Sequence, residues 1–158
     1  METRELILQA PHLVILHGGP PECGVVRDQG VIDWVADGIE YARRAGLSVE
    51  EVAAIALFRT TTGHPFMDGN HRTGVALLLA LLLYDGFELR VSNREIGEFS
   101  KSVDRDELSL GDVVAWIRMA AISRRPKAEA PVEALIEGAS LIMPEILDRY
   151  SEVFRLLA

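Results

Sequence analysis

Residues 64–84 read HPFMDGNHRTGVALLLALLLY, a dense polar run followed at once by an almost wholly apolar one. The apolar part, Val75 to Tyr84, has ten residues, whereas spanning a bilayer takes about 20. A helix without a polar face is stable when other helices surround it. The stretch therefore predicts a buried helix from about His71 to Tyr84, entered through a polar loop, and not a membrane anchor.

The length, net charge and cysteine content of the chain limit the class of protein to which it can belong. A chain of 158 residues fits one compact domain with a terminal appendage. Its net charge of -8 argues against broad nucleic-acid binding, which needs basic surface to displace counterions. The charged start of the chain lacks the apolar stretch of a secretion signal, and a single cysteine, Cys23, excludes an internal disulfide. We therefore expect a cytoplasmic protein without membrane or direct nucleic-acid partners.

Helical patterns flank the polar run on both sides. The stretch from Gly18 to Gly30 carries four glycines and two prolines, which predicts a long loop or a short hairpin. Pro126 predicts a boundary between a domain over 1–125 and a C-terminal extension over 126–158, of unknown role, with two short helices broken by Pro144. The other expected elements are helices over Leu6–His17 and Val31–Arg44, helices starting at Ser48, Ser92 and Ser109, and a short extended piece over Phe87–Val91.

The first half of the polar run suits acid–base and metal chemistry. Pro65 favours an extended backbone at His64 and so places this residue in a loop. A neutral imidazole there can take a proton from a hydroxyl near neutral pH. Phe66 is the expected apolar anchor of the loop, and Asp68 supplies a hard oxygen ligand that suits Mg²⁺ bound to phosphate oxygens.

The second half of the polar run suits the phosphates themselves. Gly69 lets the backbone approach an anion or adopt a positive φ. Asn70 is a preferred helix N-cap, and the N–H groups after it point out of the helix start, where anions bind. Arg72 adds a planar fork of donors for phosphate. A base, a metal ligand and a phosphate site together can transfer part of a nucleotide to a hydroxyl.

The run from His64 to Arg72 resembles the signature H-x-F-x-[D/E]-[G/A]-N-[G/K]-R of the Fic/Doc (Fido) superfamily, with one mismatch at His71. Three segments outside the run look like its death-on-curing branch: Arg27–Ile32, Tyr84–Phe87, and Leu108–Leu110 before Trp116. The resemblance covers roughly residues 4–123. It implies an all-α fold, a Fido-type helical bundle in which the active-site loop leads into a central buried helix.

The resemblance also implies a role for each residue of the loop. His64 would be the catalytic base and Asp68 the Mg²⁺ ligand, with ATP or another nucleoside triphosphate as co-substrate. The Gly18–Gly30 loop would be the flap against which a segment of the target lies. The implied nucleotide- and phosphate-binding residues are Gly69, Asn70, His71 and Arg72.

Two departures from the family pattern bear on the type of transfer. Adenylylating members carry a second arginine three residues after the first, and this position holds Val75. Doc-like members also lack that arginine, bind the nucleotide in a reversed orientation and act as kinases. They carry lysine where this chain has His71, which is only partly charged at neutral pH, so phosphate binding should be weaker and pH-sensitive.

We therefore expect Mg²⁺-dependent phosphoryl transfer to a protein hydroxyl of Ser, Thr or Tyr. Adenylyl transfer and a catalytically silent binding module with the same fold are the alternatives. Death-on-curing relatives are toxins of toxin–antitoxin pairs that modify elongation factor Tu. By analogy, the resemblance implies that factor as a target and a small antitoxin as a partner.

Two further hypotheses concern the same residues. His64, Asp68 and His71 have spacings that suit a metal hydrolase, although Pro65 and Gly69 argue against one continuous helix. Some superfamily members are inhibited by a helix of their own with the pattern [S/T]-x-x-x-E-[G/N], whose glutamate occupies the phosphate site. Glu137–Gly138 matches the end of that pattern, with Glu133 at the serine position.

Overall fold

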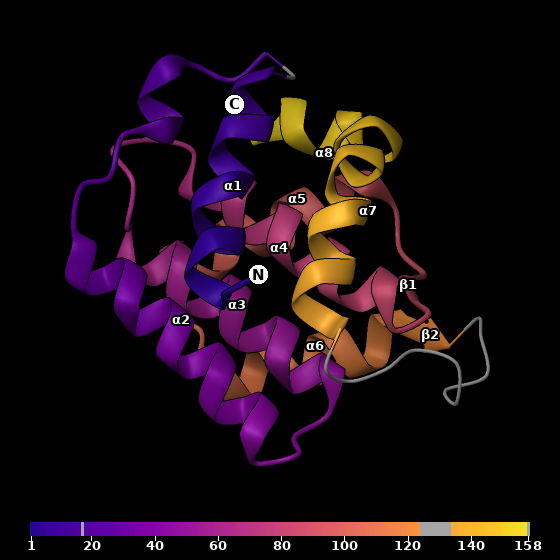
Figure 1. The fold of residues 1–158 in the computed structure, drawn as a ribbon. Coiled ribbons are helices and arrows are strands. Elements are labelled where there is room, and N and C mark those ends of the chain that lie inside the picture. The colour runs from indigo at the N-terminus through magenta and orange to yellow at the C-terminus, as the bar shows by residue number, and fades with distance from the viewer. Residues whose placement is uncertain (17, 124–133, 158) are drawn as a thin grey trace.

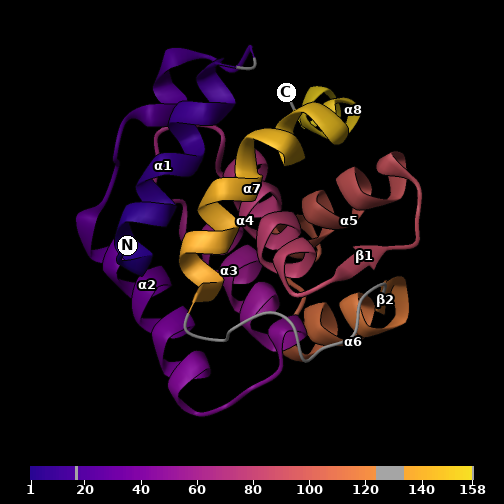
Figure 2. The same cartoon turned by 45° about the vertical axis from the view of Figure 1, so that its right-hand side comes forward.

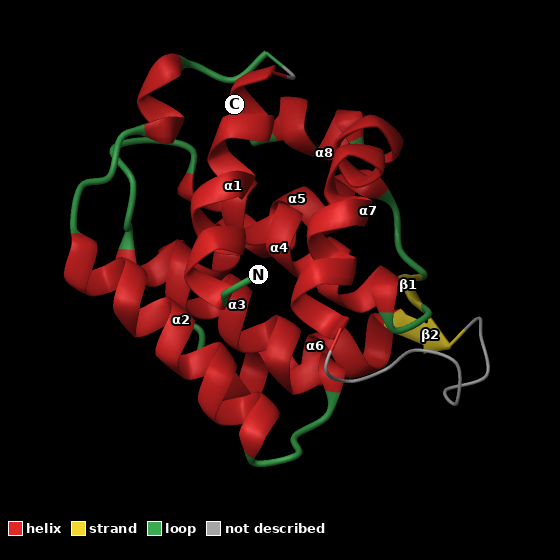
Figure 3. Cartoon of the chain, in the orientation of Figure 1, coloured by secondary structure: helices red, strands yellow, loops and turns green. Residues whose placement is uncertain are grey.

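The computed structural model describes residues 1–16, 18–123 and 134–157, and this part of the chain is mostly helical (Figure 3). The predicted all-α class is confirmed. The helices are α1 (Thr3–Leu16), α2 (Gln29–Arg44), α3 (Val49–Gly63), α4 (Asn70–Tyr84), α5 (Asn93–Arg105), α6 (Leu110–Ala120), α7 (Leu135–Arg149) and α8 (Ser151–Leu156). A 3-10 helix, η1 (Pro21–Gly24), and two strands, β1 (Phe87–Leu89) and β2 (Ala121–Ser123), lie between them.

Helix α4 lies at the centre of the bundle, with α1, α3 and α7 packed around it (Figure 1). Every residue from Thr73 to Leu82 is buried, as the apolar sequence predicts. Each fully buried leucine contributes about 1.5–3 kcal/mol relative to an exposed one, and this gain stabilises a helix that has no polar face. The helix expected from about His71 to Tyr84 is confirmed.

Local sequence signals place the starts of α3, α5 and α6 correctly, whereas α1 begins three residues before the expected Leu6 and α2 two residues before the expected Val31. Ser92 and Ser109 each form a reciprocal capping box with the residue three positions on, and Ser48 caps α3 with its hydroxyl. Helix α1 begins at Thr3 and runs to Leu16, while the expected end at His17 lies outside the described residues.

Strand β1 confirms the first three residues of the extended piece expected over Phe87–Val91. It pairs antiparallel with β2, so that Phe87 lies opposite Ser123 and Leu89 opposite Ala121. Figure 2 shows this pair beside α5 and α6. Strand β2 was not predicted, because it follows α6 directly and its three residues form a strand only by pairing with β1.

The break expected at Pro144 is wrong, because α7 continues through this proline to Arg149 and the chain breaks at Tyr150 instead. A proline inside a helix costs about 3 kcal/mol. On either side of it, Met143 and Ile146 are fully buried in the core, and each such side chain contributes about 1.5–3 kcal/mol. Packing on both sides of Pro144 therefore outweighs the lost hydrogen bond.

The C-terminal helices share the core of the rest of the chain. Helix α7 packs against α1 and α4, and buried residues of α7 and α8 belong to the same hydrophobic cluster as those of α4. The boundary expected at Pro126 lies outside the described residues. Among the described residues, none of the helices combines the length and the apolar character that crossing a membrane requires.

Candidate active site

The polar run forms the loop between α3 and α4, residues 64–69, and the first turn of α4. His64 begins the loop. His64 is the C-cap of α3 with φ 52° and ψ 61°, the left-handed conformation, and its N–H donates to the carbonyl of Thr60 at 3.3 Å. The extended backbone expected at His64 is therefore wrong. The following proline disfavours the right-handed helical region, and the left-handed region satisfies this restriction while closing the last turn of α3.

Arg27 holds the start of this loop from the neighbouring segment. Its Nε donates to the carbonyl of His64 at 2.6 Å and its Nη2 donates to the carbonyl of Gly63 at 2.8 Å. A guanidinium at these carbonyls donates to acceptors that have no partner within the helix. Its positive charge also interacts favourably with the negative end of the helix dipole. Sequence reasoning did not assign Arg27 a site role, because nothing in its neighbours along the chain indicates this contact.

The expected flap lies directly against the loop. Val26 forms an isolated antiparallel bridge with Phe66, flanked by hydrogen bonds from Arg27 N to Pro65 O (2.8 Å) and from Met67 N to Val25 O (2.9 Å). Phe66 is only 1% exposed, which confirms it as the apolar anchor of the loop. The backbone of the loop is thus fixed on both sides, by pairing with the flap and by a buried ring.

The N-cap of α4 is Gly69, and the prediction that Asn70 fills this position is wrong. Gly69 has φ 72°, and a Cβ at this position would lie 2.4 Å from Sγ of the buried Cys23. Asn70 is the first residue of the helix. Its side chain closes the loop instead: Nδ2 donates to the carbonyl of Phe66 at 2.9 Å, and Oδ1 accepts from Phe66 N at 3.0 Å.

The start of α4 has no side-chain cap and could accept an anion. Gly69 offers no side chain to cap the first N–H groups of the helix, and these groups carry the positive end of the helix dipole. Asp68 lies beside them with an exposed side chain, and its Oδ1 accepts from Gly69 N at 2.7 Å. A single exposed carboxylate fits Mg²⁺, which keeps water and substrate phosphates as its other ligands.

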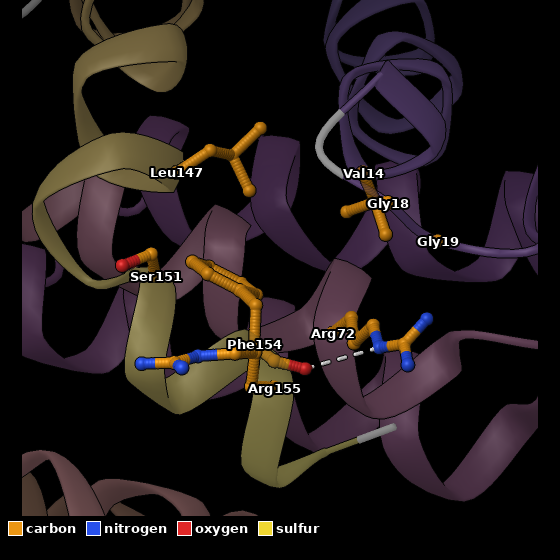
Figure 4. A pocket seen from close by; sticks show the side chains of 8 residues that line it. All are labelled: Val14, Gly18, Gly19, Arg72, Leu147, Ser151, Phe154 and Arg155. Atoms are coloured by element: carbon orange, nitrogen blue, oxygen red, sulfur yellow. Dashed lines mark hydrogen bonds between the residues drawn. The ribbon is translucent and has the colours of Figure 1, made fainter.

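Arg72 lies nine-tenths buried behind the helix start. Its Nε donates to the carbonyl of Phe154 in α8 at 3.2 Å (Figure 4). Its Nη1 donates to Sγ of Cys23 at 4.0 Å. Arg72 lines a cavity of about 210 Å³ between α1, α4, α7 and α8. Burial raises the pKa of the Cys23 thiol, and the charge of Arg72 partly opposes this effect. The cavity is lined by Val14, Gly18, Gly19, Arg72, Leu147, Ser151, Phe154 and Arg155.

His71 points toward α5 and is half-buried. A hydrogen bond of 3.1 Å joins its Nδ1 to Oγ of Ser100, and the tautomer of the ring decides which of the two donates. Burial lowers the pKa of His71 below its usual value, although the carboxylate of Asp104 opposes this shift. His71 is therefore neutral near pH 7, and it offers a hydrogen-bonding group and not a charge.

His64 meets the same helix one turn further along. Its Nε2 lies 3.4 Å from Oδ2 of Asp104, and both side chains are 43% exposed. The imidazole is thus open to solvent on one side and lies beside a carboxylate on the other. Asp104, like Arg27, carries no signal in its local sequence that links it to the loop.

The geometry argues against both the metal-hydrolase site and inhibition by a helix carrying Glu137. Within the described residues, no group of three or more His, Cys, Asp or Glu side chains could hold a metal ion, so the metal-hydrolase arrangement is not formed. Glu137 accepts from the N-terminal ammonium of Met1 at 3.1 Å, and Gly138 lies against the ring of Tyr84. Tyr84 is the last residue of α4, about 20 Å along the helix from the loop. Glu137 therefore does not reach the phosphate site, and Glu133 lies outside the described residues.

A family model described as the Fic/DOC family matches residues 11–82, from within α1 almost to the end of α4. This part of the chain is therefore similar to a Fic/DOC family domain. Such proteins are typically transferases of a nucleoside monophosphate or phosphate group, and they generally use Mg²⁺ and a nucleoside triphosphate. No curated protein matches the chain.

Proposed function

We propose that this protein transfers a phosphoryl group from ATP, or another nucleoside triphosphate, to a protein hydroxyl, in the manner of a death-on-curing kinase. The observation that carries the proposal is the arrangement within residues 64–72. An exposed imidazole begins the loop, an exposed carboxylate follows, and an uncapped helix start with a buried arginine ends it. These groups correspond to a proton acceptor, a magnesium ligand and an anion site.

Each group has a defined part in the proposed reaction. His64 takes the proton of the target hydroxyl while the hydroxyl oxygen forms a bond to the γ-phosphorus. The bond from this phosphorus to the β–γ bridging oxygen breaks, and its electron pair leaves with the nucleoside diphosphate. The first N–H groups of α4 and Arg72 hold the phosphate oxygens against the charge that accumulates on them. Mg²⁺ beside Asp68 would neutralise further negative charge when bound.

Val75 supports phosphoryl transfer over adenylyl transfer. It stands where adenylylating members carry their second arginine, and its side chain is fully buried in the core. The neutral His71 adds no charge at the position of the Doc-like lysine. Binding of the phosphates therefore depends mainly on Arg72 and the start of α4, with Gly69 allowing close approach and Asn70 fixing the loop that presents these donors.

Incubation with γ- and α-labelled ATP in the presence of Mg²⁺ tests the proposal. Cell extract and purified elongation factor Tu, the target implied by analogy, serve as acceptors. Label transferred only from the γ position supports the kinase, and label transferred from the α position means adenylyl transfer. A protein that transfers neither, with Mn²⁺ also tried, is the silent binding module.

Two variants connect any signal to the loop. His64→Ala should lower transfer by roughly 10²–10⁴-fold, because it removes the positioned base. His12→Ala removes a histidine from the exposed side of α1 and should leave transfer within about twofold of the parent. Equal transfer by the His64→Ala protein would show that His64 is not the base.

A further inference from the structure

Helix α5 places two polar side chains on the face that meets the loop and the start of α4. Ser100 and Asp104 are four residues apart, so they lie on the same face of the helix, about one turn from each other. Ser100 contacts His71 and Asp104 contacts His64. Each histidine of the polar run is thus held by its own partner from α5, 29 residues further along the chain for His71 and 40 for His64.

The two contacts differ in chemistry. Ser100 is buried and neutral, and it meets Nδ1 of the half-buried His71. Asp104 is charged and meets Nε2 of the exposed His64, at 3.4 Å. A carboxylate beside one ring nitrogen favours the proton on that nitrogen and leaves the other nitrogen as the acceptor.

We infer that Asp104 is a positioning residue for His64: its carboxylate keeps the proton on Nε2, so that Nδ1 is the nitrogen that receives the proton of the target hydroxyl. As that proton arrives, the ring becomes an imidazolium, and the negative charge of Asp104 stabilises it. The hydroxyl oxygen bonds to phosphorus and the electron pair of the broken bond leaves with the nucleoside diphosphate, as above. The catalytic half of this inference rests on the proposed function, but the assignment of the tautomer does not.

The surroundings favour His64 as the ring on which Asp104 acts. His71 also feels the charge of Asp104, but its burial keeps it neutral and its Nδ1 is already bonded to Ser100. Lys101 lies on the same helix, and its charge acts on His71 with the opposite sign to that of Asp104. Asp104 is exposed, so removing it should not unfold the protein.

Long-range ¹H–¹⁵N NMR spectra of the full chain, recorded in alkaline buffer, show which nitrogen of each histidine carries hydrogen. We expect His64 in the parent to carry it on Nε2, and Asp104→Ala to shift His64 toward a mixture of both tautomers. Ser100→Ala is the matched control, which should change the signals of His71 and leave those of His64 unchanged. An Nδ1–H tautomer of His64 in the parent, or an unchanged tautomer in Asp104→Ala, overturns the inference.

Kinetics of transfer test the catalytic half. Asp104→Ala should lower kcat about fivefold and leave the KM for ATP unchanged, as expected on losing a part-exposed ion pair that acts through another side chain. Asp104→Asn retains an oxygen that can accept from Nε2–H, so it should keep the tautomer and recover part of kcat. Asp106→Ala, which removes a neighbouring exposed carboxylate paired with Arg105, should change neither value.

An Asp104→Ala protein with the kcat of the parent would refute the positioning role. A parent protein that transfers nothing would refute the proposed function instead. In that case, the NMR spectra still decide whether Asp104 fixes the tautomer of His64, so the two failures are distinguishable.

Discussion

The Cα of Gly69 packs against the thiol of Cys23 so closely that a Cβ at position 69 would lie 2.4 Å from Sγ. Gly69 also has φ 72°, which an L-residue rarely adopts. We predict that Gly69→Ala destabilises the protein by about 2–5 kcal/mol, the sum of a left-handed backbone and an overpacked contact. Urea unfolding followed by circular dichroism measures this loss.

A second glycine separates the two causes. Gly46 has nearly the same φ, 73°, but nothing lies within 4 Å of its missing Cβ. Gly46→Ala should therefore cost only the backbone part, about 1–2 kcal/mol. In the Gly69→Ala background, Cys23→Ala should recover part of the stability. If the free energy of unfolding falls equally in the two glycine variants, the close contact with Cys23 does not contribute to the effect.

Arg27 ties the start of the loop to the flap through the carbonyls of Gly63 and His64. We predict that Arg27→Ala lowers the free energy of unfolding by about 1 kcal/mol and speeds amide hydrogen exchange over residues 64–69. Arg27→Lys should recover only part of the protection, because an ammonium lacks the planar fork that spans two carbonyls. Unchanged exchange in Arg27→Ala would mean that the pairing of Val26 with Phe66 fixes the loop alone.

Features set by neighbours along the chain could be predicted from the sequence. The capping boxes at Ser92 and Ser109 depend on residues three positions apart, and the burial of α4 follows from its lack of a polar face. Phe66 is an apolar residue within a polar run, so its burial in the core was also predictable. In each case the physical cause lies within one turn or one loop.

Features set by distant parts of the chain could not be predicted. Asn70 is a good N-cap by type, but Gly69 takes that position, since only a residue without a side chain fits against Cys23. The partners of His71 and His64, which are Ser100 and Asp104, come from α5. The place of α5 beside the loop and the start of α4 depends on the whole bundle. The periodicity of α5 shows which of its faces is polar, but not what that face meets.

The lowered pKa of His71 predicts a loss of stability in mild acid. Its ordinary pKa is about 6.5, and burial lowers this value in the folded state. As pH falls below about 6.5, the unfolded chain takes up a proton before the folded one does, so the free energy of unfolding falls until the folded ring is protonated as well. His71→Asn should flatten this decline when urea unfolding is measured from pH 7.5 to 5. If stability falls as steeply in His71→Asn as in the parent, groups other than His71 cause the loss of stability in acid.

The stability of the site depends on the helix that begins in it, and Leu77 tests this dependence. Leu77 is fully buried in α4, so Leu77→Ala should lower the free energy of unfolding by about 2–5 kcal/mol through lost burial and a cavity. Leu141 in α7 is 83% exposed and provides the matched control, since Leu141→Ala should change stability by less than about 0.5 kcal/mol. Because α4 runs from the loop through the core, the Leu77→Ala protein should also show faster hydrogen exchange at the start of this helix. Protection there equal to that of the parent would mean that the loop and the core of α4 unfold independently.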